Sequence, residues 1–152
     1  MVHIIHRIGI KASSSQVYNA LSTIKGLAGW WTENVEGDEQ IGGKITFRFH
    51  APSGEEIGAM IMEVRELTPD IKVQWHCIDG PPEWIGTDIT FELSEHNDQT
   101  IIIFAHRNWR EEVEFKAHCS MKWAVFLLSV RDYVETGNGS PSPHDVKIDN
   151  WN

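Results

Sequence analysis

The sequence predicts an α+β domain in which a curved antiparallel β-sheet wraps around a single long C-terminal helix. Three observations lead to this prediction. Apolar residues recur at steps of three and four over residues 112–136, a spacing typical of an amphipathic helix. Most of the chain before this stretch alternates apolar and polar side chains, which is typical of half-buried strands. Tight turns join these strands in sequence, so we expect them to pair as an antiparallel meander.

The first part of the chain predicts a strand over residues 4–10 followed by a short helix. Ser13 and Gln16 have the spacing of a capping box, in which each side chain satisfies a backbone donor near the other residue. The apolar stripe of this helix contains Val17, Tyr18 and Leu21. Gly26 and Gly29 are expected to end the helix before the Trp-Trp pair that follows.

Six strands are expected, and a short seventh piece is expected near Val35. The six cover residues 4–10, 45–49, 58–67, 72–77, 87–94 and 100–107. Alternation alone does not choose the register of the last strand, because Ile101 and Ile103 are as apolar as Phe104. The histidine at position 106 favours an inner face formed by Phe104 and His106, where a ligand, water or carbonyl can pair with the imidazole.

The C-terminal helix is expected to place its apolar stripe against the sheet. This stripe contains Cys119, Trp123, Phe126, Leu127, Val130, Tyr133 and Val134, whereas His118, Lys122, Ser129 and Asp132 line another side. About 25 residues at roughly 1.5 Å each make a rod long enough to cross a small sheet. Gly137 and the prolines that follow it end the helix. Two alternatives exist for the start of this helix. Either Asn108 caps the helix directly, or residues 109–114 form a loop and the helix begins after them.

Composition indicates one domain over residues 1–152, with a tail over 137–152. The formal net charge of −9 leaves no basic surface for nucleic acid or for an anionic membrane. The chain has neither a signal-peptide pattern nor a long apolar run, so we expect a cytoplasmic protein.

Cys77 and Cys119 are expected to be buried thiols, because no basic group is evidently placed to activate either one. Neither a cofactor nor a metal site is expected. Seven tryptophans are more than a dry core usually holds, so some should line a cavity.

Several strings of residues, taken in order, resemble one known family. They are Val17-Tyr-Asn-Ala-Leu21, Trp30-Trp-Thr32, Gly37-Asp38 with Gly42, Val64-Arg-Glu-Leu-Thr-Pro69, Trp75-His-Cys77, Gly80-Pro81 with Trp84-Ile-Gly-Thr87, Phe104-Ala-His106 with Trp109, and Trp123 with Leu127-Leu-Ser-Val130 and Tyr133-Val-Glu-Thr-Gly-Asn-Gly139. In order and spacing they resemble the START-like SRPBCC superfamily, and within it the homologues of the heat-shock-protein ATPase activator. The resemblance covers nearly the whole chain. It implies the helix-grip fold and a link to the stress response.

The resemblance also implies a cavity between the concave face of the sheet and the long helix. The side chains expected to bind a ligand there are Trp31, Phe47, Phe49, Met60, Met62, Trp75, Cys77, Phe91, Phe104, His106, Trp109, Trp123, Phe126 and Leu127. Aromatic and methionine side chains make adaptable walls for an apolar ligand. The first functional hypothesis is therefore the binding of a small apolar or aromatic molecule.

Two other functions remain open. The first is a protein-interaction module with a chaperone as partner, which follows from the resemblance alone. The second is an enzyme of the cyclase or hydrolase kind, for which the sequence offers no convincing acid and base pair, so no catalytic residue is assigned. His106 could orient a ligand or act as an acid or base, but the favoured interpretation is a residue of the cavity wall whose imidazole hydrogen-bonds a backbone carbonyl. Of Trp30 and Trp31, one is expected in the core and one at the cavity mouth. The chain is expected to be a monomer or a homodimer.

Overall fold

A curved seven-stranded sheet grips one long helix in the computed structural model, which describes residues 1–152. The elements are, in chain order, β1 (Val2–Ile10), α1 (Ser14–Ser22), α2 (Ile24–Trp30), β2 (Asn34–Gly37), β3 (Lys44–His50), β4 (Glu56–Thr68), β5 (Lys72–Asp79), β6 (Asp88–His96), β7 (Gln99–Trp109) and α3 (Glu114–Thr136). Every pairing is antiparallel, and the strand order is β1-β7-β6-β5-β4-β3-β2. The predicted helix-grip architecture is confirmed.

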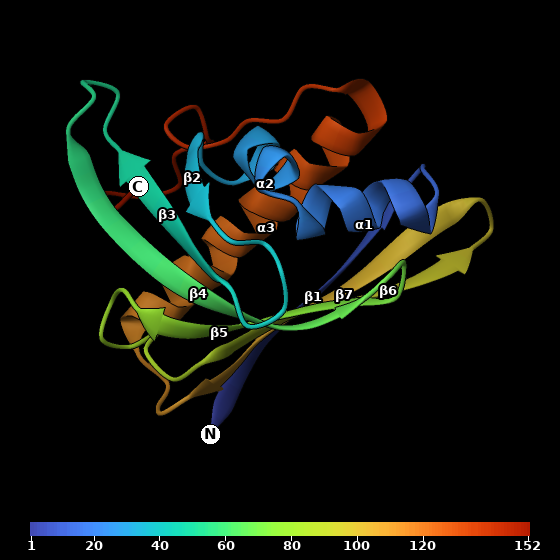
Figure 1. Ribbon diagram of the computed structural model, residues 1–152. Helices are drawn as coiled ribbons and strands as arrows, with labels where there is room; N and C mark the ends of the chain where they lie inside the picture. The colour runs from blue at the N-terminus through green and yellow to red at the C-terminus, as the bar shows by residue number, and fades with distance from the viewer.

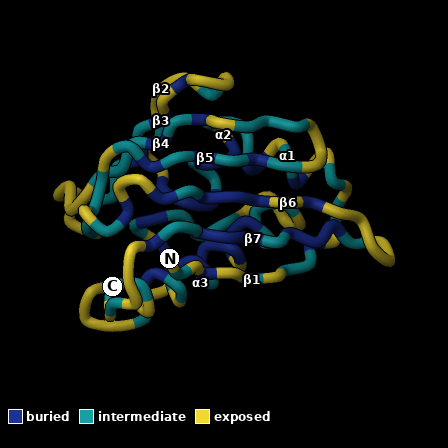
Figure 2. The backbone as a smooth tube through the Cα atoms, turned by 90° about the horizontal axis from the view of Figure 1, so that it is seen from below, coloured by how far each residue is buried: buried dark blue, intermediate teal, exposed yellow.

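All three helices lie on the concave side of the sheet, as Figure 1 shows. The core fills the space between this face and the helices. Figure 2 shows buried residues along the interior strands β6 and β7, whereas several of the turns are exposed. Burial of apolar side chains in this space is the main force that holds the helices onto the sheet. No helix has both the length and the apolar character needed to cross a membrane.

Two helices stand where the sequence predicted one. The capping box of Ser13 and Gln16 starts α1 as expected. Thr23 ends α1 and also caps α2, because its hydroxyl accepts a hydrogen bond from the backbone N–H of Gly26 at 3.0 Å. The expectation that Gly26 and Gly29 end the helix was therefore wrong. A Cβ at position 26 would lie 2.6 Å from the carbonyl oxygen of Ala20, so the glycine permits close packing of α2 on α1.

The long helix begins later than residue 112 and ends as predicted. Asn108 does not cap it, because this residue is still part of β7, with a φ of 74°. Val113 is the N-cap and makes no side-chain hydrogen bond, so the alternative of a loop before the helix is the correct one. Gly137 provides the left-handed C-terminal cap, with a φ of 86°.

The register of β7 follows the prediction from His106. Phe104 and His106 are fully buried on the inner face. Ile101 and Ala105 alternate to the other face, and they are buried there as well. Burial on both faces explains why the apolar pattern of this strand could not decide its register.

Candidate ligand pocket beside the C-terminal tail

A pocket of about 260 Å³ lies at one end of the space between the sheet and α3. Its walls come from β3, β4, the loop before β6, the first half of α3 and the tail formed by residues 137–152. The lining side chains are mostly apolar; all the lining residues are Trp31, Phe49, Ile57, Gly58, Met60, Pro81, Trp84, Phe115, His118, Cys119, Lys122, Trp123, Phe126, Ser142, Asp145, Trp151 and Asn152.

Strand register places the sheet side of the pocket. Phe49 of β3 is directly opposite Gly58 of β4, so both side-chain positions face the same side of the sheet. Met60 follows two residues after Gly58 and shares that face. Because glycine has no side chain, the wall is hollow at position 58, where a Cβ would meet no atom within 4 Å.

Aromatic rings form the inner wall. Trp31 follows α2 and packs on Trp123 of α3, with ring centroids 5.0 Å apart. Trp123 also stacks on Trp84, at 5.9 Å and an interplanar angle of 17°. Ring pairs at these separations stabilise one another beyond the burial of their area. The wall is therefore apolar and closely packed.

Only part of the predicted set of site residues reaches this pocket. Trp31, Phe49, Met60, Trp123 and Phe126 line it. The others are buried in the core behind it and do not line it: Phe47, Met62, Trp75, Cys77, Phe91, Phe104, His106, Trp109 and Leu127. Large rings fill most of the space between sheet and helix, so open volume remains only at the end beside the tail. Both rings of the Trp pair are buried in the core, so the expectation of one ring at the cavity mouth was wrong. The indole N–H of Trp30 donates to the carbonyl of Ala20 at 2.8 Å, and Trp31 lines the inner wall of the pocket.

His106 forms a closed hydrogen-bond chain behind the pocket wall. The indole N–H of Trp123 donates to Nδ1 of His106 at 3.1 Å. Nδ1 is therefore an acceptor, so the ring proton is on Nε2 and is donated to Oγ1 of Thr87 at 2.8 Å. The Thr87 hydroxyl in turn donates to the carbonyl of Trp84 at 2.5 Å. Both ring nitrogens are thus satisfied by side chains, not by the backbone carbonyl that the sequence led us to expect.

The environment of His106 keeps the imidazole neutral. Burial lowers the pKa of His106 from 6.5 to about 3, because the charged form would lose its hydration. The neutral ring can serve as an acceptor for Trp123 and a donor to Thr87 at once. His106 therefore positions the tryptophan that forms the pocket wall.

Both cysteines are free and buried, as predicted. Burial raises the pKa of Cys77 to about 11 and that of Cys119 to about 12. The Cys119 side chain lines the pocket, but at neutral pH it remains a thiol. It therefore contributes to the wall and provides no activated nucleophile.

The tail closes one side of the pocket by pairing with the segment after α2. The backbone N–H of Ser142 donates to the carbonyl of Trp31 at 2.8 Å. The carbonyl of Ser142 accepts a hydrogen bond from the backbone N–H of Glu33 at 3.2 Å. Ser129 of α3 joins the same region, because its hydroxyl donates to the carbonyl of Trp30 and accepts from the N–H of Ser140, both at 2.8 Å. The tail is therefore fixed to both α2 and α3.

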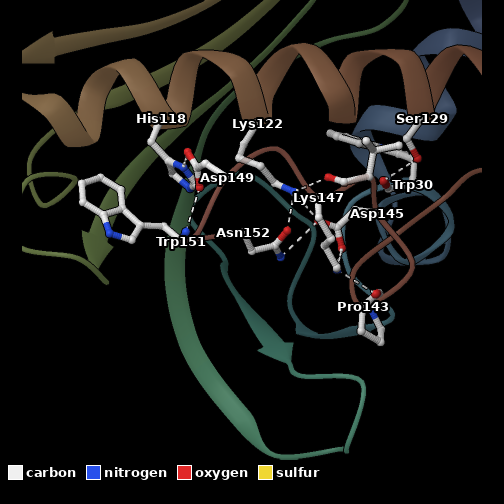
Figure 3. A network of polar contacts seen from close by, with 11 residues as sticks. Trp30, His118, Lys122, Ser129, Pro143, Asp145, Lys147, Asp149, Trp151 and Asn152 are labelled. Atoms are coloured by element: carbon white, nitrogen blue, oxygen red, sulfur yellow. Dashed lines mark hydrogen bonds and ion pairs between the residues drawn. The ribbon is translucent and has the colours of Figure 1, made fainter.

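A buried ion pair holds the next part of the tail (Figure 3). The side chain of Asp145 is only 1% exposed and accepts from the ammonium groups of Lys122 and Lys147. Lys122 also donates to the carbonyl of Val146 at 2.9 Å. Burial alone would raise the pKa of Asp145. The hydrogen bond and charge of Lys122, a backbone hydrogen bond and the hydrogen bond from Lys147 together outweigh burial, so the pKa is lowered.

The end of the tail is held by a histidine of α3. Nδ1 of His118 lies 2.7 Å from a carboxylate oxygen of Asp149 (Figure 3), and this hydrogen bond lowers the pKa of Asp149. The His118 ring stacks on Phe115, with centroids 6.0 Å apart, and meets the edge of Trp151 at 5.6 Å. Trp151 is half exposed, so it stands at the rim of the pocket.

Sequence reasoning missed this polar side of the pocket. His118 and Lys122 are four residues apart on one helix face, and Asp145 and Asp149 are also four apart, so the spacing itself was a weak signal. Nothing in the pattern showed that the tail folds back over this helix face. Its Gly- and Pro-rich start indicated only that the helix ends.

Comparison with known proteins identifies the fold and the family. A model of the family described as "Activator of Hsp90 ATPase homolog 1-like protein" matches residues 11–135, so the whole tail lies outside the matched segment. The Aha1 dimer from Colwellia psychrerythraea, solved in solution, is 43% identical, with a TM-score of 0.81 over 91% of this chain and 100% of that one. Among curated proteins, no match is found.

More distant structures share the fold alone. Protein SSP2350 from Staphylococcus saprophyticus is 15% identical, with a TM-score of 0.73 over 91% of this chain and 95% of that one. CalU16 from Micromonospora echinospora is 18% identical, with a TM-score of 0.70 over 93% of this chain and 77% of that one. At these identities the likeness concerns the backbone and not the contents of the pocket.

Proposed function

The chain belongs to the activator of Hsp90 ATPase homolog 1-like family, and on that premise we propose that it binds a small apolar or aromatic molecule in the pocket beside the tail. The observation that carries the proposal is an open, mostly apolar volume in a molecule whose interior is otherwise filled by large rings. The pocket is partly open to solvent and has a volume of about 260 Å³, and its mostly apolar lining with a few polar groups is typical of small-molecule sites.

The size and walls of the pocket indicate the kind of occupant. A dry apolar cavity of roughly 150 Å³ is enough to take up benzene. The larger volume here suits a molecule of one or two fused aromatic rings. Trp31, Trp123 and Phe126 line the wall with aromatic carbon atoms, and Met60 offers a flexible thioether that can adapt to the shape of the ligand.

The proposal concerns binding without a chemical step. A general acid or base must have a ring nitrogen or carboxylate free to reach the substrate. His106 uses both ring nitrogens within the chain, and Cys119 remains a protonated thiol. The cyclase or hydrolase alternative therefore gains no support from these two residues.

Titration with naphthalene tests the proposal. We would follow backbone and indole N–H signals by two-dimensional NMR, and we expect saturable shifts of the Trp31, Trp84 and Trp123 signals. Gly58→Leu should weaken binding by at least about tenfold, because the new side chain grows into the hollow at position 58. Ala59→Leu is the matched control, since alternation turns residue 59 to the other face of the sheet. Absence of saturable shifts, or equal affinity in both variants, would reject this function.

A second candidate is an interaction with an Hsp90-type chaperone. It is favoured by the family match and by the 43% identity to a protein called Aha1. We would measure the ATPase rate of an Hsp90 chaperone with and without this chain, and an increase that saturates with added chain is the expected result. Because that relative was solved as a dimer, we also propose a homodimer, which light scattering at several concentrations would detect.

A further inference from the structure

His118 contributes a polar atom without a partner to the pocket. Its side chain is 11% exposed, and it is one of the lining residues. Nδ1 is occupied by Asp149 at 2.7 Å, whereas Nε2 makes no hydrogen bond within the chain. Nε2 is not among the fully buried polar atoms, so it is open to the pocket. The ring is held in place by Phe115 and Trp151, so the position of Nε2 is fixed.

The hydrogen bond at Nδ1 of His118 determines whether Nε2 donates or accepts a hydrogen bond. A carboxylate can only accept a hydrogen bond, so the Asp149 contact places the ring proton of His118 on Nδ1. In the neutral imidazole, Nε2 then carries a lone pair and acts as an acceptor. It suits a ligand group that donates a hydrogen bond.

The other charged group in the wall is already satisfied. The ammonium of Lys122 binds Asp145, the carbonyl of Val146 and the side-chain oxygen of Asn152. An ammonium group has three protons, so no donor remains for a ligand. His118 is therefore the better candidate for the polar contact.

We propose that Nε2 of His118 accepts a hydrogen bond from a hydroxyl group of the ligand, so that the pocket prefers phenols and similar hydroxylated aromatic molecules to the bare hydrocarbons. This inference rests on the proposed binding function and adds the class of ligand. A phenol places its ring against the aromatic wall and its O–H toward His118. A hydrocarbon of the same shape would displace water from Nε2 without replacing the hydrogen bond.

Three matched probes test the preference at pH 7: 2-naphthol, naphthalene and 2-methoxynaphthalene. The three share one ring system, but only 2-naphthol can donate a hydrogen bond. By the same NMR titration we expect 2-naphthol to bind roughly tenfold more tightly than either of the others, the usual effect of one hydrogen bond.

Two variants assign the preference to the correct atom. In His118→Asn, the amide can still reach Asp149 but has no atom at the place of Nε2, so the preference for 2-naphthol should disappear. In His118→Gln, the longer side chain carries an amide oxygen near the place of Nε2, so part of the preference should remain. Melting curves of both variants check that the tail and the fold are intact.

The outcomes separate this inference from the proposed function. Equal affinities of the wild type for all three probes would overturn the role of His118 and leave ligand binding in place. A preference that survives in His118→Asn, or tight binding of the methyl ether, would also overturn it. No saturable binding of any probe would reject the proposed function and this inference together.

Discussion

Trp123 of α3 donates its indole N–H to Nδ1 of His106 on β7 at 3.1 Å, and both side chains are buried in the core. This contact joins the one long helix to the inner face of the sheet. It also orients the ring that separates the filled core from the open pocket. The same residue therefore contributes to stability and to the shape of the site.

Replacement of Trp123 by alanine should lower the free energy of unfolding by about 3 to 5 kcal/mol, because it removes a large buried ring and leaves Nδ1 of His106 without a donor. Urea denaturation measures the change. Trp151→Ala is the control, and its loss should stay below about 1 kcal/mol because that ring is half exposed. A similarly small loss for Trp123→Ala would contradict its placement in the core.

Stability should fall with falling pH in a window set by His106. Its pKa is lowered by burial from 6.5 in the unfolded chain to about 3 in the native state. Between these values the unfolded chain binds a proton that the native protein does not. The contribution of the neutral, buried His106 to the free energy of unfolding is therefore complete above pH 6.5 and is lost as the pH falls toward 3. His106→Gln should remove a slope of about 1.4 kcal/mol per pH unit between pH 6 and pH 4. Urea denaturation between pH 4 and pH 6 measures how the free energy of unfolding depends on pH. If the variant and the wild type show the same slope, His106 is not buried as a neutral ring.

Asp145→Asn should release the tail and leave the core folded. The change removes the charge that pairs with Lys122, and an unpaired ammonium group is costly to keep buried. Undocking of residues 142–152 would return Lys122 to water. Hydrogen exchange should therefore speed up in this segment and stay unchanged in β6 and β7. Unchanged exchange in the tail would show that the ion pair does not hold it.

Gly26→Ala should destabilise the protein, although alanine is the better helix former by about 1 kcal/mol. The new methyl would lie 2.6 Å from the carbonyl oxygen of Ala20, so α2 would have to move away from α1. Gly58→Ala is the matched control, because a Cβ there meets open space and should change the melting temperature little. Equal melting temperatures for the two variants would show that α1 and α2 can shift without cost.

Local patterns were sufficient for most of the fold. The capping box of Ser13 and the left-handed glycine at position 137 are features of a few neighbouring residues, and the structure bears out both. The inner face of β7 was also predicted correctly from His106. The restart of the helix at Thr23 was missed, because the close packing that favours Gly26 depends on a contact with a different helix.

The pocket could be predicted only in part. Alternation showed which side chains face inward, but not how completely their rings would fill the space. Phe47 and Trp75 face inward and yet belong to the solid core. The polar wall depends on contacts between α3 and the tail, such as Lys122 with Asp145, which are 23 residues apart in the sequence. No periodic pattern records contacts of that kind.

The most direct test of the central claim is a crystal structure of the protein grown with 1-bromonaphthalene. Anomalous scattering locates the bromine without any assumption about the shape of the ligand. We expect a strong bromine peak inside the pocket, within contact distance of Trp31, Trp123 and Phe126, and no such peak in crystals of Gly58→Leu. A bromine peak only on the outer surface, or none in a pocket that is open in the crystal, would contradict the central claim.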